Sequence, residues 1–267
     1  MRLLLISDVH ANLPALDGVL NHASYDDVLF MGDAVDYGPF PFEVYSRLSQ
    51  VRAKRVLGNH DVAAALGIDC RSNPQLREAS VITRERITVP RMPKRAMQAL
   101  VKKAERRMDL DYAGLRIRMV HASPTDELYQ YVSKEEAPNL EMRGTDLLLL
   151  GHTHIPYEVK TGDVWIVNPG SVGMPRDGNP RASYAILDTF TRRVQFEKVE
   201  YNIEETITKL HQLIGDETRV YQLLATILRT GDVGHPARHA VREGVIASQE
   251  GESAGPIGKI REPPHND

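Results

Sequence analysis

Short apolar runs that end in polar residues recur along this chain, and they limit its fold more than any other feature. They occupy residues 3–7, 28–31, 54–57, 115–120, 146–150 and 164–167. Runs of this length, bounded by Gly, Asp or Asn, are typical of buried or half-buried strands. Between the first two runs, Leu13, Leu16, Val19 and Leu20 share one face of a helix that Asn12 can cap. This strand-helix-strand order predicts an α/β fold whose sheet is parallel in its first half.

The second half of the chain predicts further elements. Residues 183–187 and 193–199 read as an antiparallel hairpin, so the sheets are expected to be mixed. Asn202 and Glu205 resemble a capping box for a helix, and a second helix is expected around residues 217–229. Residues 231–267 hold six Gly, four Pro and no aromatic residue, so they cannot supply a core. We expect one domain at 1–202, C-terminal helices at 203–230 and a Gly/Pro-rich tail at 231–267.

Residues 67–110 differ in character from the rest of the first domain. They lack strand periodicity and carry eleven Lys and Arg against five Asp and Glu, a net charge of +6. Apolar residues fall there at helical spacing: Met97, Leu100, Val101, Ala104 and Met108. This pattern predicts a helical insertion with one apolar and one basic face. The basic face is either solvated or attracts an anionic substrate or nucleic acid.

Charge and cysteine content exclude several classes of protein. The net charge of -3 and pI near 6.4 argue against a surface devoted wholly to nucleic acid. The single cysteine, Cys70, excludes an internal disulfide and a thiolate zinc site, and it fits a reducing compartment. No apolar stretch approaches the roughly 18 residues of a membrane helix, and the first run is too short for a signal-peptide core. We therefore expect a cytoplasmic protein without a membrane partner; the sequence leaves the oligomeric state open.

Polar side chains follow these apolar runs directly. They are Asp8, His10, Asp33, Asn59, His60, His121, His152 and His154. Such positions lie at the carboxyl edge of an α/β sheet, where these folds place their ligand sites. Buried carboxylates and imidazoles without partners cost kilocalories each. A bound metal is the simplest partner for all of them.

The types of these residues restrict the metal. Two Asp, one Asn and four or five His without Cys suit Mn, Fe, Co, Ni or Zn rather than calcium or a sulfur cluster. Seven ligands exceed one tetrahedral site but suffice for two ions that share a bridging carboxylate. Two ions about 3.5 to 4 Å apart stabilise the attacking and the departing oxygen at phosphorus and lower the pKa of a bound water.

The ordered series DVH, GDAVDYGP, GNHD, VHASP, GHTH and NPGSV resembles the calcineurin-like metallophosphoesterase superfamily. The segments GDAVDYGP and NPGSVGMPRDG resemble its small bacterial and archaeal phosphodiesterase branch. The resemblance covers about residues 1–200 and implies an αββα sandwich of mixed sheets flanked by helices. Each motif alone is weak, but the ordered set is highly specific.

The resemblance also implies a role for each polar residue. Asp8, His10 and His154 would hold one divalent ion, Asn59, His121 and His152 a second, and Asp33 would bridge them. His60 would stand beside the leaving group as the catalytic residue. Asn168, Gly170 and Ser171 would form a structural turn near the metals, and Arg176 would contact substrate.

The spacing of the two histidines in GHTH suggests how one segment serves two ions. In an extended segment, residues two apart point the same way, so His152 and His154 are expected to reach one ion each. The same geometry is expected of Asp8 and His10 on the facing strand.

The expected activity is hydrolysis of a phosphate ester, in which hydroxide between two metal ions, Mn first among the candidates, attacks phosphorus and His60 assists departure. A small phosphodiester or nucleotide-type substrate is favoured, because small members of the family commonly act so and the basic insertion suits an anionic ligand. The alternatives are a phosphoprotein or phosphomonoester phosphatase, a nuclease, and a catalytically inactive binding scaffold of the same fold.

Overall fold

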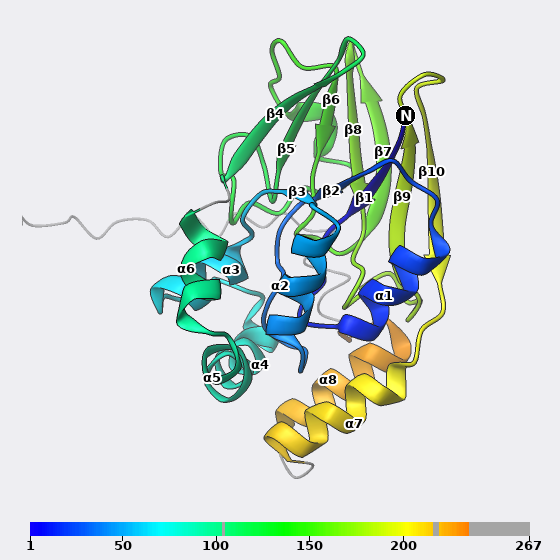
Figure 1. Cartoon of the computed structure of the whole chain (residues 1–267). Coiled ribbons are helices and arrows are strands. Elements are labelled where there is room, and N and C mark those ends of the chain that lie inside the picture. Colours follow the sequence, from blue (N-terminus) through cyan, green and yellow to red (C-terminus); the bar gives the residue numbers. More distant parts are fainter. Residues whose placement is uncertain (103–104, 216–218, 235–267) are drawn as a thin grey trace, which may run out of the picture.

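Two five-stranded mixed sheets face each other in this computed structural model, which describes residues 1–102, 105–215 and 219–234 (Figure 1). The first sheet has the order β10-β9-β1-β2-β3. Its strands are β1 (Arg2–Ile6), β2 (Asp27–Phe30), β3 (Lys54–Arg55), β9 (Ala182–Asp188) and β10 (Arg193–Val199). β1, β2 and β3 are parallel, and the hairpin β9-β10 joins β1 in antiparallel register. The predicted parallel first half and antiparallel hairpin are both confirmed.

The second sheet has the order β4-β5-β6-β8-β7. Its strands are β4 (Arg107–Tyr112), β5 (Leu115–Val120), β6 (Leu147–Leu149), β7 (Pro156–Thr161) and β8 (Val164–Pro169). The central strands β5, β6 and β8 are parallel, while β4 and β7 are antiparallel edge strands. The carboxyl ends of β1, β2, β5 and β6 therefore lie at one edge of the paired sheets.

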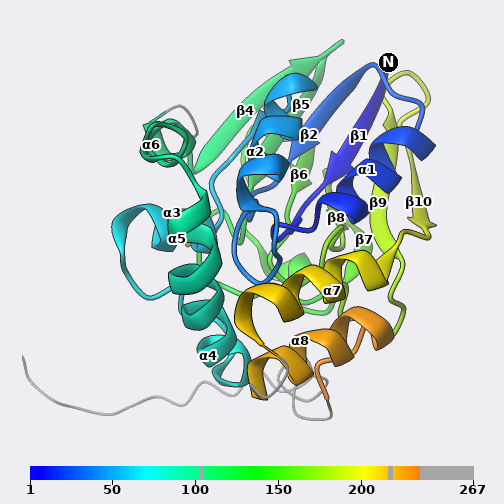
Figure 2. The same ribbon diagram turned by 60° about the horizontal axis from the view of Figure 1, so that its bottom comes forward.

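Helices cover the outer face of the first sheet and the edge below it (Figures 1 and 2). They are α1 (Leu13–His22), α2 (Pro41–Gln50), α3 (Asn59–Leu66), α4 (Pro74–Thr83), the π-helix η1 (Arg84–Thr88), α5 (Val89–Arg91), α6 (Lys94–Lys102), α7 (Ile203–Ile214) and α8 (Arg219–Thr230). The backbone N–H of Ala15 donates to the side chain of Asn12, which confirms the predicted cap of α1. Asn202 caps α7 in the same way, by accepting from Glu205.

Strand alternation divides the apolar residues of β1 between two layers. Leu4 and Ile6 pack against α1 and α2, whereas Leu3 and Leu5 face the second sheet. The outer face of the second sheet is covered by residues 121–146, which contain the short 3-10 helix η2 (Ala137–Asn139). The predicted α/β architecture of two mixed sheets flanked by helices is confirmed.

The helical insertion ends earlier than its spacing predicts. α6 stops at Lys102, and Met108 lies in the edge strand β4 opposite Met119. Met108, Leu110 and Tyr112 alternate along β4 and pack on the core between the sheets. Pairing with β5 therefore overrides the helical periodicity at Met108. Ala104, a further member of that predicted face, lies outside the described residues, as does the tail from residue 235 onward.

No helix in the described part of the chain combines the length and the apolar character that crossing a membrane requires.

The turn that follows β8 lies directly against the end of β1, and this contact makes a stability prediction. A Cβ on Gly173 would lie 1.8 Å from the carbonyl oxygen of Val9, which is backbone and cannot give way. We expect Gly173→Ala to lower the free energy of unfolding by about 3 kcal/mol, the upper end of the usual overpacking penalty, as measured by urea denaturation. Gly18→Ala in α1 is the control, because its Cβ would meet only ordinary contacts, 3.4 Å or more away. Equal stability of the two variants would contradict this packing.

Candidate metal centre

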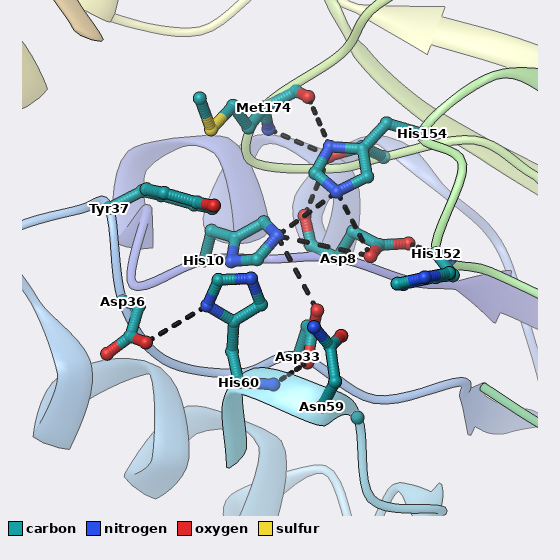
Figure 3. A network of polar contacts seen from close by, with 12 residues as sticks. Asp8, His10, Asp33, Asp36, Tyr37, Asn59, His60, His152, His154 and Met174 are labelled. Atoms are coloured by element: carbon teal, nitrogen blue, oxygen red, sulfur yellow. Dashed lines mark hydrogen bonds and ion pairs between the residues drawn. The ribbon is translucent and has the colours of Figure 1, made fainter. Parts of the chain in front are cut away.

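The eight polar side chains predicted from strand ends meet at one edge of the paired sheets; all of them except His121 are labelled in Figure 3. Asp8 and His10 follow β1, Asp33 follows β2, His121 follows β5, and His152 and His154 follow β6. Each of these residues, together with Asn59 and His60, is at most 3% exposed. The structure thus brings the whole predicted set together in a buried cluster.

Six of these residues form two groups whose ligand atoms lie within 4.8 Å of one another. One group is Asp8, His10 and His154, and the other is Asp33, His121 and His152. Asn59 joins the second group, since its Oδ1 lies 3.0 Å from His121 Nε2. One oxygen of Asp33, Oδ2, is 3.3 Å from His121 Nε2 and 3.8 Å from His10 Nε2. Asp33 therefore lies between the two groups.

The backbone that carries these residues is not extended, so the expected geometry of GHTH is wrong. His152 and His154 have φ values of 66° and 62°, and Asp8, His10 and Asp33 have φ values of 53°, 46° and 63°. All five adopt the left-handed conformation, which non-glycine residues rarely enter. A turn at each strand end, rather than strand alternation, sends His152 and His154 to different groups. The same turns send Asp8 and His10 to one group.

Asn59 and His60 are the first two residues of helix α3 rather than the end of a strand. The backbone N–H of His60 donates to Asp33 Oδ1 at 2.9 Å. The residue before them must be glycine, because a Cβ on Gly58 would lie 2.0 Å from that same carboxylate oxygen. The positive end of the α3 dipole therefore points at Asp33.

Asp61 is a structural residue of the centre that the sequence analysis missed. Its carboxylate accepts the backbone N–H groups of Asp33 and Ala34, both at 2.9 Å, and of Gly58 at 3.1 Å. It ties the loop after β2 to the start of α3. An acidic residue at the third position of a helix is the signal that could have revealed this role.

Four imidazoles each direct one nitrogen at a backbone carbonyl. The pairs are His10 Nδ1 with Val35 O at 3.0 Å, His154 Nδ1 with Met174 O at 2.6 Å, His121 Nδ1 with Met31 O at 2.7 Å, and His152 Nε2 with Tyr129 O at 3.2 Å. A carbonyl only accepts, so these ring nitrogens carry the hydrogen. In a neutral imidazole, the other nitrogen then presents a lone pair.

Those other nitrogens face each other in pairs. His10 Nε2 lies 3.2 Å from His154 Nε2, and His121 Nε2 lies 3.1 Å from His152 Nδ1. Burial lowers the pKa of His10 and of His154, and it lowers the pKa of His152 to about 3. Burial acts in the same direction on His121, but the Asp33 carboxylate raises its pKa to about 9. If His121 is protonated, its Nε2–H can donate to His152 Nδ1 in the second pair. Both rings of the first pair are neutral, so no N–H lies between their facing nitrogens.

The first group carries a further acceptor. Asp8 Oδ1 is buried, has no hydrogen-bond partner among the described residues, and lies 3.3 Å from His154 Nε2. Two imidazole lone pairs and a carboxylate oxygen therefore converge on one point. Three hydrogen-bond acceptors with no N–H or O–H between them are stabilised by a cation. Two imidazole nitrogens and a carboxylate oxygen are ligands that fit a divalent transition metal.

His60 lies beside the two groups but in neither. Its Nδ1 is 3.0 Å from Asp36 Oδ2, and its ring meets that of His10 edge-on at 5.0 Å. Burial opposes protonation, but the nearby oxygens of Tyr37, Asp33 and Asp36 raise the pKa of His60 well above its ordinary value. His60 is thus suited to donate a proton toward the centre.

The turn from Asn168 to Met174 braces the centre, as its predicted structural role requires. Asn168 Nδ2 donates to Gly151 O at 2.7 Å, and Ser171 Oγ donates to Asp8 O at 2.7 Å. Arg176 follows this turn, and its backbone N–H donates to His154 O at 3.4 Å. The buried Nε of Arg176 has no hydrogen-bond partner in the described part of the chain. Its contact with substrate stays a prediction.

Known proteins resemble this chain in sequence and in fold. The family model described as the calcineurin-like phosphoesterase superfamily domain matches residues 1–192. Phosphodiesterase YfcE of Escherichia coli is 30% identical over 199 residues, which are 70% of this chain and 88% of the relative. An uncharacterized protein of Methanocaldococcus jannaschii is 29% identical over 224 residues, 77% of this chain and 90% of the relative.

A solved structure agrees with these sequence matches. The metallophosphoesterase from Sphaerobacter thermophilus has 33% sequence identity and a TM-score of 0.69, and the match covers 86% of this chain and 99% of that one. The chain therefore belongs to the calcineurin-like phosphoesterase superfamily, which confirms the resemblance of its motifs and the prediction of a hydrolase that acts on phosphate ester bonds.

Proposed function

We propose that this protein is a dinuclear metal-dependent phosphodiesterase that hydrolyses a small phosphodiester or nucleotide-type ester. The observation that carries the proposal is the 3.2 Å contact between the facing nitrogens of His10 and His154 beside the unpaired Asp8 Oδ1. The likeness to a relative named as a phosphodiesterase supports the substrate class. The single cysteine supports a reducing, cytoplasmic setting.

In this proposal, each group of side chains holds one divalent ion. Asp8, His10 and His154 would hold the first, Asn59, His121 and His152 would hold the second, and Asp33, which lies between the groups, would contact both. Carboxylate, amide and imidazole donors without sulfur suit Mn, Fe, Co, Ni or Zn, with Mn the first candidate. When bound, such a pair of ions makes hydroxide available near neutral pH and offsets charge at phosphorus.

The other residues around the centre orient the substrate and move a proton. His60 is the proposed acid: its Nδ1 faces Asp36, so Nε2 is the nitrogen that would donate to the departing oxygen. The unpaired guanidinium nitrogen of Arg176 supports a role in binding a phosphoryl oxygen. Burial of His60 and Asp36 strengthens their charge interaction, because bulk water is excluded.

The alternatives differ in substrate rather than in the site. A phosphomonoesterase or phosphoprotein phosphatase would use the same groups and would release phosphate from monoesters but leave diesters intact. An inactive scaffold is disfavoured, because His60 and all seven proposed ligand residues are present and buried.

The number of bound ions gives the first test. Wild-type protein dialysed against Mn²⁺ is expected to retain about two ions per chain, and His154→Ala or His152→Ala is expected to lose about one, because each removes a donor from one group. Elemental analysis of the dialysed proteins measures this. His22→Ala, which removes an exposed histidine at the end of α1 that belongs to neither ligand group, is the control. Unchanged metal content in the first two variants would rule out the proposed ligands.

Turnover gives the second test. With Mn²⁺ and methyl phenyl phosphate, whose phenol leaves poorly without a proton, His60→Ala is expected to lower kcat by at least about 10²-fold while metal content stays at the wild-type level. The reason is that His60 donates a proton but belongs to neither ligand group. The catalytic reading fails if wild-type protein hydrolyses neither this diester nor p-nitrophenyl phosphate faster than the variant does.

A further inference from the structure

One arginine of the helical insertion, Arg84, points into the protein instead of toward solvent. It is 7% exposed, and no other Lys or Arg residue of the insertion is buried among those that the structure describes. It opens the π-helix η1 (Arg84–Thr88), between α4 and α5. A π-helical turn is rare and frequently marks a functional site.

Two side chains of the π-helix, those of Arg84 and Thr88, donate hydrogen bonds to the two carboxylate oxygens of Asp36. Arg84 Nε donates to Asp36 Oδ2 at 3.0 Å, and a second guanidinium nitrogen, Nη2, donates to the same oxygen. Thr88 Oγ1 donates to Asp36 Oδ1 at 3.0 Å. The third arm of the guanidinium, Nη1, donates to the backbone oxygen of Ile68 at 3.1 Å, just beyond α3. Arg84 therefore links the insertion, the loop that carries Asp36 and the segment after the helix of His60.

Asp36 is the residue that orients His60. It is fully buried, has a left-handed φ of 65°, and lies 3.0 Å from His60 Nδ1 (Figure 3). The oxygen that faces His60 is Oδ2, the same one that Arg84 holds. A buried carboxylate that lost its cation would be costly and would shift or take up a proton. The orientation of the His60 ring thus depends on Arg84, which lies 48 residues after Asp36 in the sequence.

We propose that Arg84, with Thr88, is a positioning residue that fixes Asp36 so that His60 delivers its proton to the leaving group. This inference rests on the proposed role of His60. It assigns the π-helical part of the insertion to the chemistry of the centre rather than to the attraction of an anionic ligand. Arg84 itself touches neither ligand group.

Leaving groups of different acidity separate positioning from general support of the fold. Methyl p-nitrophenyl phosphate releases an acidic phenol that needs little help, whereas methyl phenyl phosphate releases a poorer leaving group that needs a proton. Arg84→Met is expected to lower kcat for methyl phenyl phosphate roughly 10- to 100-fold. This is the usual effect of removing a residue that orients a functional side chain without touching the substrate. The loss for methyl p-nitrophenyl phosphate should be much smaller, with KM and Mn content unchanged.

The chain supplies a matched control in the same π-helix. Arg86 is exposed, so Arg86→Met removes the same charge two residues away without touching Asp36. It should leave both rates at wild-type values. Added guanidinium ion at millimolar concentration should restore part of the methyl phenyl phosphate activity that Arg84→Ala loses, and it should leave the activity of Arg86→Ala unchanged.

Two milder variants keep the test decisive if Arg84→Met does not fold. Arg84→Lys keeps the charge but not the guanidinium, and Thr88→Val removes only the donor to Asp36 Oδ1. Both variants should lose more kcat with methyl phenyl phosphate than with methyl p-nitrophenyl phosphate, but each loss should be smaller than in Arg84→Met. Equal losses with the two substrates, or loss of Mn, would overturn the positioning role.

His60→Ala, measured in parallel, separates this inference from the proposed function. A strong leaving-group dependence in His60→Ala without one in the Arg84 and Thr88 variants would overturn the positioning role alone. Absence of that dependence in His60→Ala would instead overturn the proposed role of His60, and the inference with it.

Discussion

The contact on which the centre depends is that between His10 Nε2 and His154 Nε2, 3.2 Å apart and 144 residues apart in the sequence. The single N–H of the His10 ring donates to Val35 O, and that of the His154 ring donates to Met174 O. The lone pairs of the other two nitrogens therefore face each other beside the unpaired Asp8 Oδ1. Burial keeps both rings neutral by lowering their pKa. Such an arrangement is stable when a cation lies between the acceptors, and this requirement links the fold to metal chemistry.

The rest of the structure holds these acceptors in place. Paired sheets bring four strand ends to one edge, and left-handed turns at Asp8, His10, Asp33, His152 and His154 aim the side chains inward. Backbone conformations of this kind cost of order 1–3 kcal/mol each and cluster at functional sites. Asp61 and Ser171 offset that cost, since they hold the backbone of these turns through hydrogen bonds. Stability and function therefore draw on the same contacts.

Much of this was predictable from the sequence, because strand ends at one sheet edge must meet wherever they lie in the chain. That rule identified the residues that follow β1, β2, β5 and β6, while Asn59 and His60 follow an apolar run but open helix α3. The order of the motifs identified the family. The left-handed turns were missed, since alternation in a strand assumes an extended backbone. Asp61 and Arg84 were missed because their partners are 28 and 48 residues distant, and a charge count treats every arginine of the insertion as a surface cation. Met108 was misplaced because pairing with β5 outweighs local periodicity.

Anomalous diffraction from crystals grown with Mn²⁺ shows whether the two groups of side chains hold ions. Two anomalous peaks per chain are expected: one between the facing nitrogens of His10 and His154, and one between those of His121 and His152, with Asp33 in contact with both. Crystals that hold Mn²⁺ only at other sites, or that keep the 3.2 Å contact between His10 and His154 with no ion beside it at saturating Mn²⁺, would contradict this expectation.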